Sequence, residues 1–199
     1  MPYLTIDPKD IGKKYQSIIR INSQSGKGAV AYILETDFQC VIPKKMQASV
    51  ASFIQKEAEK TASEISSTEV WDIFNQEFVN RDDNLVLDKI NIEPFDNGQV
   101  ILDVMITYNR QKNSLSATRN GPINASKKAL TRLFSNLIID SYSEHSLSHG
   151  SDSQAICYIS ILFDDVLYHG AGIDTNLTQA SIKALFSAIN RRLNMKQHG

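Results

Sequence analysis

In the first half of the chain, apolar residues recur at helical spacing in two stretches. In residues 43–64, Pro43 suits the first turn of a helix whose apolar residues share one face. Further on, Ser66 and Glu69 have the spacing of a capping box, which predicts a second helix start. The two apolar faces comprise Met46, Val50, Phe53, Ile54, Ala58, Val70, Trp71, Ile73 and Phe74.

The second half of the chain is dominated by strand-like patterning. Short apolar runs are separated by turn formers such as Asp96-Asn97-Gly98, which predicts a hairpin. A helix is expected from Pro122, with an apolar side that extends to Leu137. The expected strands are 85–95, 100–108, 114–118, 138–147, 154–163 and 166–173, and the last helix is 177–193.

The order of elements in this half repeats, and so do some of its letters. The sequence ASKKAL at 125–130 matches ASIKAL at 180–185 in five of six positions, 55 residues apart. At the same offset, Val104 and Ile106 correspond to Ile159 and Ile161. We therefore expect a duplicated β-β-β-α unit with pseudo-twofold symmetry.

The polar sequence NRDDN at 80–84 separates the two regions. We expect an α+β chain in which residues 1–82 form a small α/β linker subdomain of short strands and two helices. Residues 83–199 would form the second domain, with repeats of about 85–137 and 138–194. Small ligands often bind at the seam between such halves.

A glycine cluster near the N-terminus, NSQSGKGAVAYIL at 22–34, invites comparison with a phosphate-binding loop. The G-x-x-x-x-G-K-[ST] pattern ending at Gly26-Lys27 needs a glycine where Ile21 stands and a hydroxyl residue where Gly28 stands. Residues 29–34 are rich in β-formers and predict a strand. A tight glycine turn between two strands is therefore expected.

Composition and charge exclude several classes of protein. The net charge is −1 and the basic clusters are short, which argues against a nucleic-acid partner. No apolar run approaches the ~20 residues needed to cross a bilayer, and no signal peptide opens the chain. Cys40 and Cys157 lack a C-x-x-C neighbour and are expected to be free, buried thiols. We expect a soluble cytoplasmic protein without a membrane partner.

Spacing alone reveals no catalytic set. His145 and His149 would share a helical face, but they fall in or after a predicted strand. A metal pair and a polar pair at a strand end both remain open. Asp164-Asp165 favours a turn over a general acid–base pair.

The starts of two predicted helices are better candidates for a ligand site. Small and polar residues precede each helix, in RNGPINAS at 119–126 and in GIDTNLTQAS at 172–181. Free backbone N–H groups at such a point can bind a carboxylate. The alternative is ordinary capping, by Asn120 in one helix and by Thr175 or Asn176 in the other.

Several long segments of the chain point to one enzyme family. The segment PYLTIDPKDIGKKYQSIIRINSQSGKGAVAYIL, from Pro2, resembles the part that follows the catalytic barrel in the 2-isopropylmalate synthases. The family's C-terminal regulatory domain is similar to WDIFNQEFV, RNGPINA, SYSEHSLSHGSDSQAICYI and GAGIDTNLTQASIKALFSAINR. The resemblance runs in order from residue 2 to about 192.

The resemblance implies a linker subdomain and a regulatory domain of an enzyme that joins acetyl-CoA to 2-oxoisovalerate and is inhibited by leucine. It implies a homodimer and no cofactor in these residues, since the divalent metal would belong to the catalytic barrel. The barrel's H-x-H motif is absent from the sequence. These residues alone are therefore expected to be inactive.

The resemblance also implies site residues. Tyr3 would reach the active site of the partner subunit. The leucine pocket would comprise Arg119, Ile123, Asn124, Ile139, Tyr142, Ser146, Ser153 and Ala155. Arg119 stands where the family often has glycine, and Asn124, Ser146 and Ser153 stand where it often has alanine. These polar residues put leucine itself in question as the effector.

Two other functions remain compatible with the sequence. One is a dimerisation module whose pocket is filled by its own side chains. The other is the regulatory domain of a related citramalate or homocitrate synthase, with a different effector.

Overall fold

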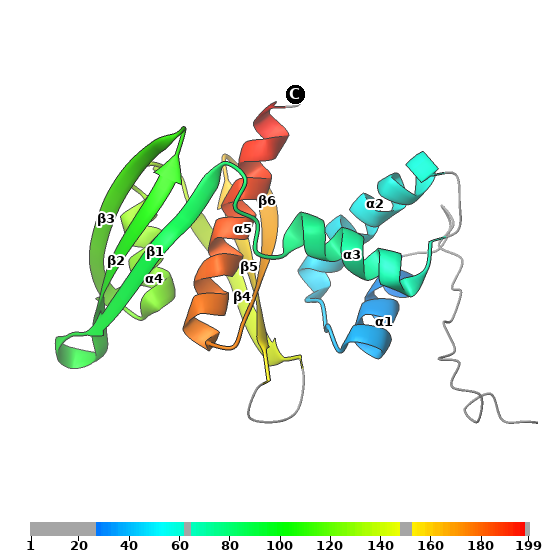
Figure 1. The fold of residues 1–199 in the computed structure, drawn as a ribbon, viewed down its shortest axis with the longest axis horizontal. Helices are drawn as coiled ribbons and strands as arrows, with labels where there is room; N and C mark the ends of the chain where they lie inside the picture. The colour runs from blue at the N-terminus through cyan, green and yellow to red at the C-terminus, as the bar shows by residue number, and fades with distance from the viewer. Residues whose placement is uncertain (1–26, 62–64, 148–152, 198–199) are drawn as a thin grey trace, which may run out of the picture.

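The structure, a computed structural model, describes residues 27–61, 65–147 and 153–197. Its elements are α1 (Lys27–Phe38), α2 (Lys44–Thr61), α3 (Ser67–Phe78), β1 (Leu85–Pro94), a 3₁₀ turn (Asp96–Gly98), β2 (Gln99–Tyr108), β3 (Gln111–Asn120), α4 (Pro122–Leu130), β4 (Ile138–Ser146), β5 (Ala155–Phe163), β6 (Val166–Asp174) and α5 (Leu177–Gln197). Figure 1 shows the three N-terminal helices at one side of two separate sheets. The α+β class is confirmed.

The strand expected at residues 29–34 is wrong, because α1 occupies them. Val30, Ile33 and Leu34 are buried at helical spacing, and this outweighs the local excess of β-formers. Gly28 accordingly lies inside a helix and not in a turn. Gly26 and the extended stretches expected before it lie outside the described residues.

The helices α2 and α3 were correctly predicted, as was the capping box of α3. The amide N–H of Glu69 donates to Ser66 Oγ at 3.3 Å, and the Glu69 carboxylate accepts from the Ser66 N–H at 2.7 Å. Both interactions satisfy N–H groups that a helix leaves without a backbone partner. Two or three turns of each helix then bury an apolar face in a common core.

The duplication is confirmed by two three-stranded antiparallel sheets of the same order, β1-β2-β3 and β4-β5-β6. The hairpins match as well: Asn109-Arg110 and Asp164-Asp165, 55 residues apart, have the same pair of positive φ angles, 50° and 62°. Such angles suit the tight turns that continue the twist of paired strands. The turn expected at Asp164-Asp165 is therefore confirmed.

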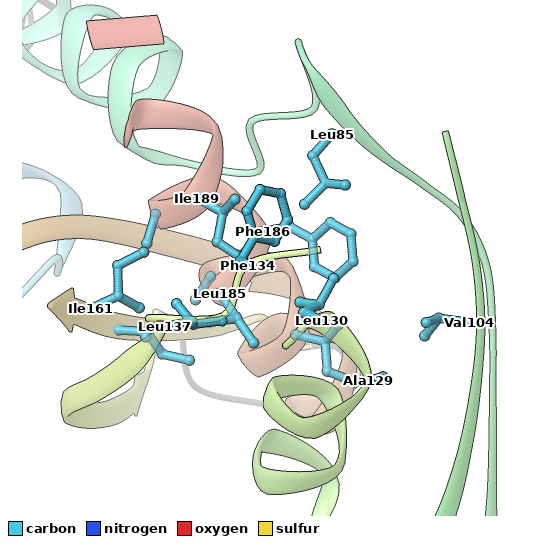
Figure 2. Close-up of a cluster of buried hydrophobic side chains, with 14 of the residues drawn as sticks. Leu85, Val104, Ala129, Leu130, Phe134, Leu137, Ile161, Leu185, Phe186 and Ile189 are labelled. Carbon is cyan, nitrogen blue, oxygen red and sulfur yellow. The ribbon is translucent and has the colours of Figure 1, made fainter. Parts of the chain in front are cut away.

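The helix from Pro122 is shorter than its apolar side suggested, because α4 ends at Leu130. Phe134 and Leu137 lie beyond the helix but remain buried in the same core. This core combines the inner faces of both sheets with α4 and α5, and Figure 2 shows its side chains, among them Leu130, Ile161 and Phe186.

The outer faces of the two sheets differ. Ile156, Tyr158 and Ala171 of the second sheet are buried against α1–α3. The corresponding residues of the first sheet include Asp103 and Ser116, which are exposed. The helical segment thus accounts for the divergence of the repeats on this face, whereas the shared inner face keeps its apolar residues.

The segment after α3 fixes the helices to the edge of the second sheet. The side chain of Asn80 donates to the Ile173 carbonyl and accepts from the Ile173 N–H, both at 3.0 Å. The Asn80 N–H also donates to the Ala171 carbonyl at 3.0 Å. The division of the chain at residues 82 and 83 stays a prediction.

Candidate functional site

The predicted pocket residues form two groups in the structure. Arg119, Ile123 and Asn124 lie at the end of β3 and in the first turn of α4. The second group lies along β4 and at or just before the start of β5, and comprises Ile139, Tyr142, Ser146, Ser153 and Ala155. Ile123 and Ile139 both pack against the shared core. Tyr3 lies outside the described residues.

Four residues of the second group, Ile139, Tyr142, Ser146 and Ala155, lie on the inner face of the second sheet. Tyr142 pairs with Ile159, and Ser146 pairs with Ala155, so these side chains face the same way as the core residues of β5. The helix α5 packs mainly on β5 and β6, which leaves the edge strand β4 less covered. Tyr142 is accordingly 41% exposed, although the facing Ile159 is buried. The accessible surface of β4 thus presents Ile139 and Tyr142, with the exposed carboxylate of Glu144 and the hydroxyl of Ser146 toward the other end of the strand.

A buried thiol lies on the same face, next to Tyr142. Cys157 Sγ is 3.9 Å from the Tyr142 hydroxyl and 3.8 Å from the carbonyl of Leu177, the first residue of α5. Burial, with a contribution from Glu144, raises the pKa of Cys157 to about 12. The thiol is therefore neutral at physiological pH, which suits an apolar binding surface better than nucleophilic chemistry. Both cysteines are free and buried, as expected.

The first group belongs to a different kind of surface, a polar groove of about 530 Å³. Its lining residues are Gln99, Arg119, Asn120, Asn124, Lys127, Lys128 and Thr131. The Arg119 guanidinium donates to the Thr118 carbonyl at 2.9 Å, and the Asn124 amide donates to the Asn120 carbonyl at 3.0 Å. Arg119 and Asn124 thus line a cationic groove, whereas Ile123 packs against the core.

The sequence pointed to Arg119, Asn120 and Asn124 but missed Gln99 and the residues from the middle and end of α4 that line the groove. Asn124, Lys127, Lys128 and Thr131 lie three, one and three residues apart, which places them along one flank of α4. This polar stripe along α4 is the signal in the sequence that could have identified the groove.

The two helix starts are capped differently. In α5, Asn176 Oδ1 accepts from the Gln179 N–H at 3.1 Å, so Asn176 is confirmed as an ordinary cap. In α4 the cap position is Gly121, not Asn120, and it makes no side-chain hydrogen bond. The first turn of α4 therefore has N–H groups that a side-chain cap does not satisfy.

The His145 side chain makes structural contacts with Tyr158 and with the backbone of residues 39 and 41. Its ring lies on the outer face of β4, stacks on Tyr158 with ring centres 5.6 Å apart, and has Nε2 within 3.2 Å of the Val41 N–H and the Gln39 carbonyl. Burial lowers the pKa of His145. Within the described ranges, no group of three or more His, Cys, Asp or Glu side chains could hold a metal ion. His149 lies outside them.

No helix in the described part of the chain is long and apolar enough to cross a membrane.

Comparisons with known proteins agree with the resemblance seen in the sequence. Residues 64–193 match the family described as the LeuA allosteric (dimerisation) domain, and residues 1–35 match the alpha-isopropylmalate synthase post-catalytic domain-like family. The chain is 36% identical to a 2-isopropylmalate synthase of Thermobifida fusca and 37% identical to one of Rhizobium johnstonii.

These alignments cover 96% and 98% of the chain. They cover only 34% and 36% of the two relatives. A 2-isopropylmalate synthase of Clostridium acetobutylicum is similar to the same extent, with 36% identity over 96% of this chain and 35% of its own length. The chain thus spans about a third of the length of these relatives.

Proposed function

Since the chain belongs to the LeuA allosteric (dimerisation) domain family, we propose that it binds leucine, or a similar apolar amino acid, as a feedback effector. The enzyme regulated would be a cytoplasmic, homodimeric 2-isopropylmalate synthase, the name that its relatives carry. That enzyme would condense acetyl-CoA with 2-oxoisovalerate. The divalent metal and the catalytic barrel would belong to the part of the relatives that these residues do not cover.

The observation that carries the proposal is the accessible inner face of β4. Tyr142 is exposed there beside buried apolar residues, and Ile139 follows on the same face at the other end of the strand. An apolar amino acid needs such a wall for its side chain. Ser146 and Ser153 would then border the polar end of the ligand.

The position of this face also suggests how binding would be communicated. β4 is an edge strand of its sheet, so a second copy of the chain has access to the same surface. A ligand that contacts both copies would change how they pack. Coupling energies of this kind are typically ~1–3 kcal/mol. Tyr3 would complete the link by reaching the active site of the partner subunit.

Titration calorimetry with leucine, isoleucine and valine tests the proposal. We expect saturable heat with leucine, and at least ten-fold weaker binding by Tyr142→Ala. The control is Tyr32→Ala, at an exposed position on α1. Absence of heat from all three amino acids, with a folded dimer shown by light scattering, would leave a module that only dimerises. Heat with a different effector would favour a citramalate or homocitrate synthase.

A further inference from the structure

The duplication provides an internal comparison for the cationic groove. In the second repeat, Lys183 Nζ lies 2.6 Å from Asp174 Oδ2, and Asp174 Oδ1 accepts from the Asn176 N–H at 2.8 Å. One carboxylate thus neutralises a lysine of α5 and meets the polar backbone at the start of that helix. In the second repeat, Lys183 is therefore neutralised by an acid of the same repeat.

The first repeat has the lysine but not the acid. Lys128 stands 55 residues before Lys183, and Arg119 stands 55 residues before Asp174. A third cation, Lys127, replaces Ile182. Among the residues that the structure describes, the ion pairs involve other side chains, and no acid lines the groove.

The two repeats also differ in the backbone groups at the starts of α4 and α5. Asn176 caps α5, but the corresponding Gly121 gives α4 no side-chain cap. Gln99, Asn120 and Asn124 add amide groups to the lining, and Thr131 adds a hydroxyl. The groove therefore combines three cations, hydrogen-bond donors and a helix start, at the place where the second repeat holds its own carboxylate.

We propose that this groove binds a small molecule with two or more anionic groups, either a phosphate ester or a polycarboxylate. One anionic group would take the place that the Asp174 carboxylate has in the second repeat, between Arg119 and Lys128. Arginine suits this role because its planar fork binds carboxylate or phosphate oxygens in pairs. A volume of about 530 Å³ is in the range of small-molecule sites.

The proposed ligand differs from an apolar amino-acid effector, so Arg119 and Asn124, which the resemblance assigned to the leucine pocket, are assigned to the anion site instead. Leucine carries a single carboxylate and an ammonium group, and the ammonium group would be repelled by three cations. It also has an isobutyl side chain, for which a lining of charged, amide and hydroxyl residues offers no apolar wall. The anion site would be a second input to the same domain.

Titration calorimetry of the chain with pyrophosphate and with citrate tests the proposal and separates the two ligand classes. We expect binding of at least one of them, weakened at least ten-fold by Arg119→Asp, because this change recreates the internal acid–lysine pair of the second repeat. Arg119→Gln should weaken binding to a smaller extent. Lys112→Gln, at the exposed opposite end of β3, is the matched control and should bind as the unmodified chain does.

Circular dichroism establishes that each variant is folded before its titration is interpreted. The proposal is overturned if the folded, unmodified chain binds neither anion at millimolar concentration, or if folded Arg119→Asp binds as tightly as Lys112→Gln. A parallel titration with leucine separates the two inputs. Leucine binding without anion binding removes only the anion site, and the reverse removes only the apolar effector.

Discussion

The guanidinium of Arg191 stacks on the ring of Phe78, with its central carbon 3.8 Å from the ring centre. The same side chain pairs with Glu77 at 2.9 Å and donates to the His169 carbonyl at 3.0 Å. It is only 3% exposed. Arg191 thus connects α5 to both α3 and β6, so a movement of the second sheet would be transmitted to the three N-terminal helices.

Replacement of Arg191 by methionine should lower the free energy of unfolding by about 3 kcal/mol. Breaking a buried ion pair usually costs about 3–5 kcal/mol, and the lower end applies because Glu77 still pairs with Arg81. Urea unfolding followed by the fluorescence of Trp71, the single tryptophan, measures the change. Lys112→Met, at an exposed position, should change stability by less than ~0.5 kcal/mol. Equal stability of the two variants would contradict this role.

Asn190→Ala should be at least as destabilising, by roughly 3–5 kcal/mol, because its side chain satisfies four backbone groups. Its Oδ1 accepts from the N–H groups of Asn84 and Leu85 at 2.9 and 2.8 Å. Its Nδ2 donates to the carbonyls of Arg81 and Leu85 at 2.8 and 2.9 Å.

Amide hydrogen exchange measures the effect of Asn190→Ala at the individual backbone N–H groups. The Leu85 N–H should lose its protection in Asn190→Ala, whereas Asn91→Ala, at an exposed position of β1, should leave it unchanged. Retained protection of Leu85 in the first variant would show that another group satisfies the junction.

The order of strands and helices along residues 85–193, the turns at Asp96–Gly98 and Asp164-Asp165 and the capping box could be predicted from the sequence, because each depends on residues close together in the chain. Residues 29–34 could not, since a window of six residues with Val30 and Ile33 suits a strand or a helix equally well. Burial of Val30, Ile33 and Leu34 against α2 and α3 decides between them, and this burial is a property of the tertiary fold.

The candidate site was predictable to a similar degree. Residues that alternate along β4 share a face, so Tyr142 and Ser146 could be grouped from the sequence. The position of the Arg119 side chain in the groove could not be predicted from the sequence, because it depends on how α4 folds back beside β3. The sequence repeat places Arg119 at the position of Asp174. That this exchange removes the partner of a lysine follows only from the Asp174–Lys183 ion pair in the structure.

Because β6 lies close to α5, alanine substitutions at different glycines should differ strongly in their effect on stability. A Cβ on Gly172 would lie 2.0 Å from the Ala180 carbonyl oxygen, and one on Gly170 would lie 2.2 Å from the Ala188 nitrogen. Backbone atoms cannot yield locally, so the strand would have to separate from the helix. Gly172→Ala should therefore cost more than ~3 kcal/mol or prevent folding, since even milder overpacking costs ~1–3 kcal/mol.

Gly28→Ala is the matched control for this prediction. A Cβ on Gly28 meets nothing within 4 Å, and the residue lies inside α1. Alanine should stabilise the chain there by about 0.5–1 kcal/mol, because it favours the helix and restricts the unfolded chain. Thermal unfolding of both variants distinguishes them, and a Gly172→Ala variant as stable as Gly28→Ala would contradict the packing.

His169 predicts a loss of stability in mild acid. Burial, with the nearby charge of Arg191, lowers the pKa of His169 from 6.5 to about 4 in the folded protein. Between these values the unfolded chain binds more protons than the folded one, so stability falls as the pH decreases from about 6.5 to about 4. The full contribution, of order 3 kcal/mol, is present above pH 7.

His169→Gln isolates this contribution, because glutamine does not titrate and can still bond to Ser160 Oγ, which lies 2.8 Å from His169 Nδ1. The free energy of unfolding should be measured between pH 4 and pH 8 for both proteins. The stability of the unmodified chain relative to the variant should decrease steadily as the pH falls through this window. The pKa of one acidic group, Asp140, is lowered first by its hydrogen bond with Lys45 and is also affected by the charge of His169. A difference independent of pH would mean that the pKa of His169 is the same in the folded and the unfolded chain, which contradicts the prediction.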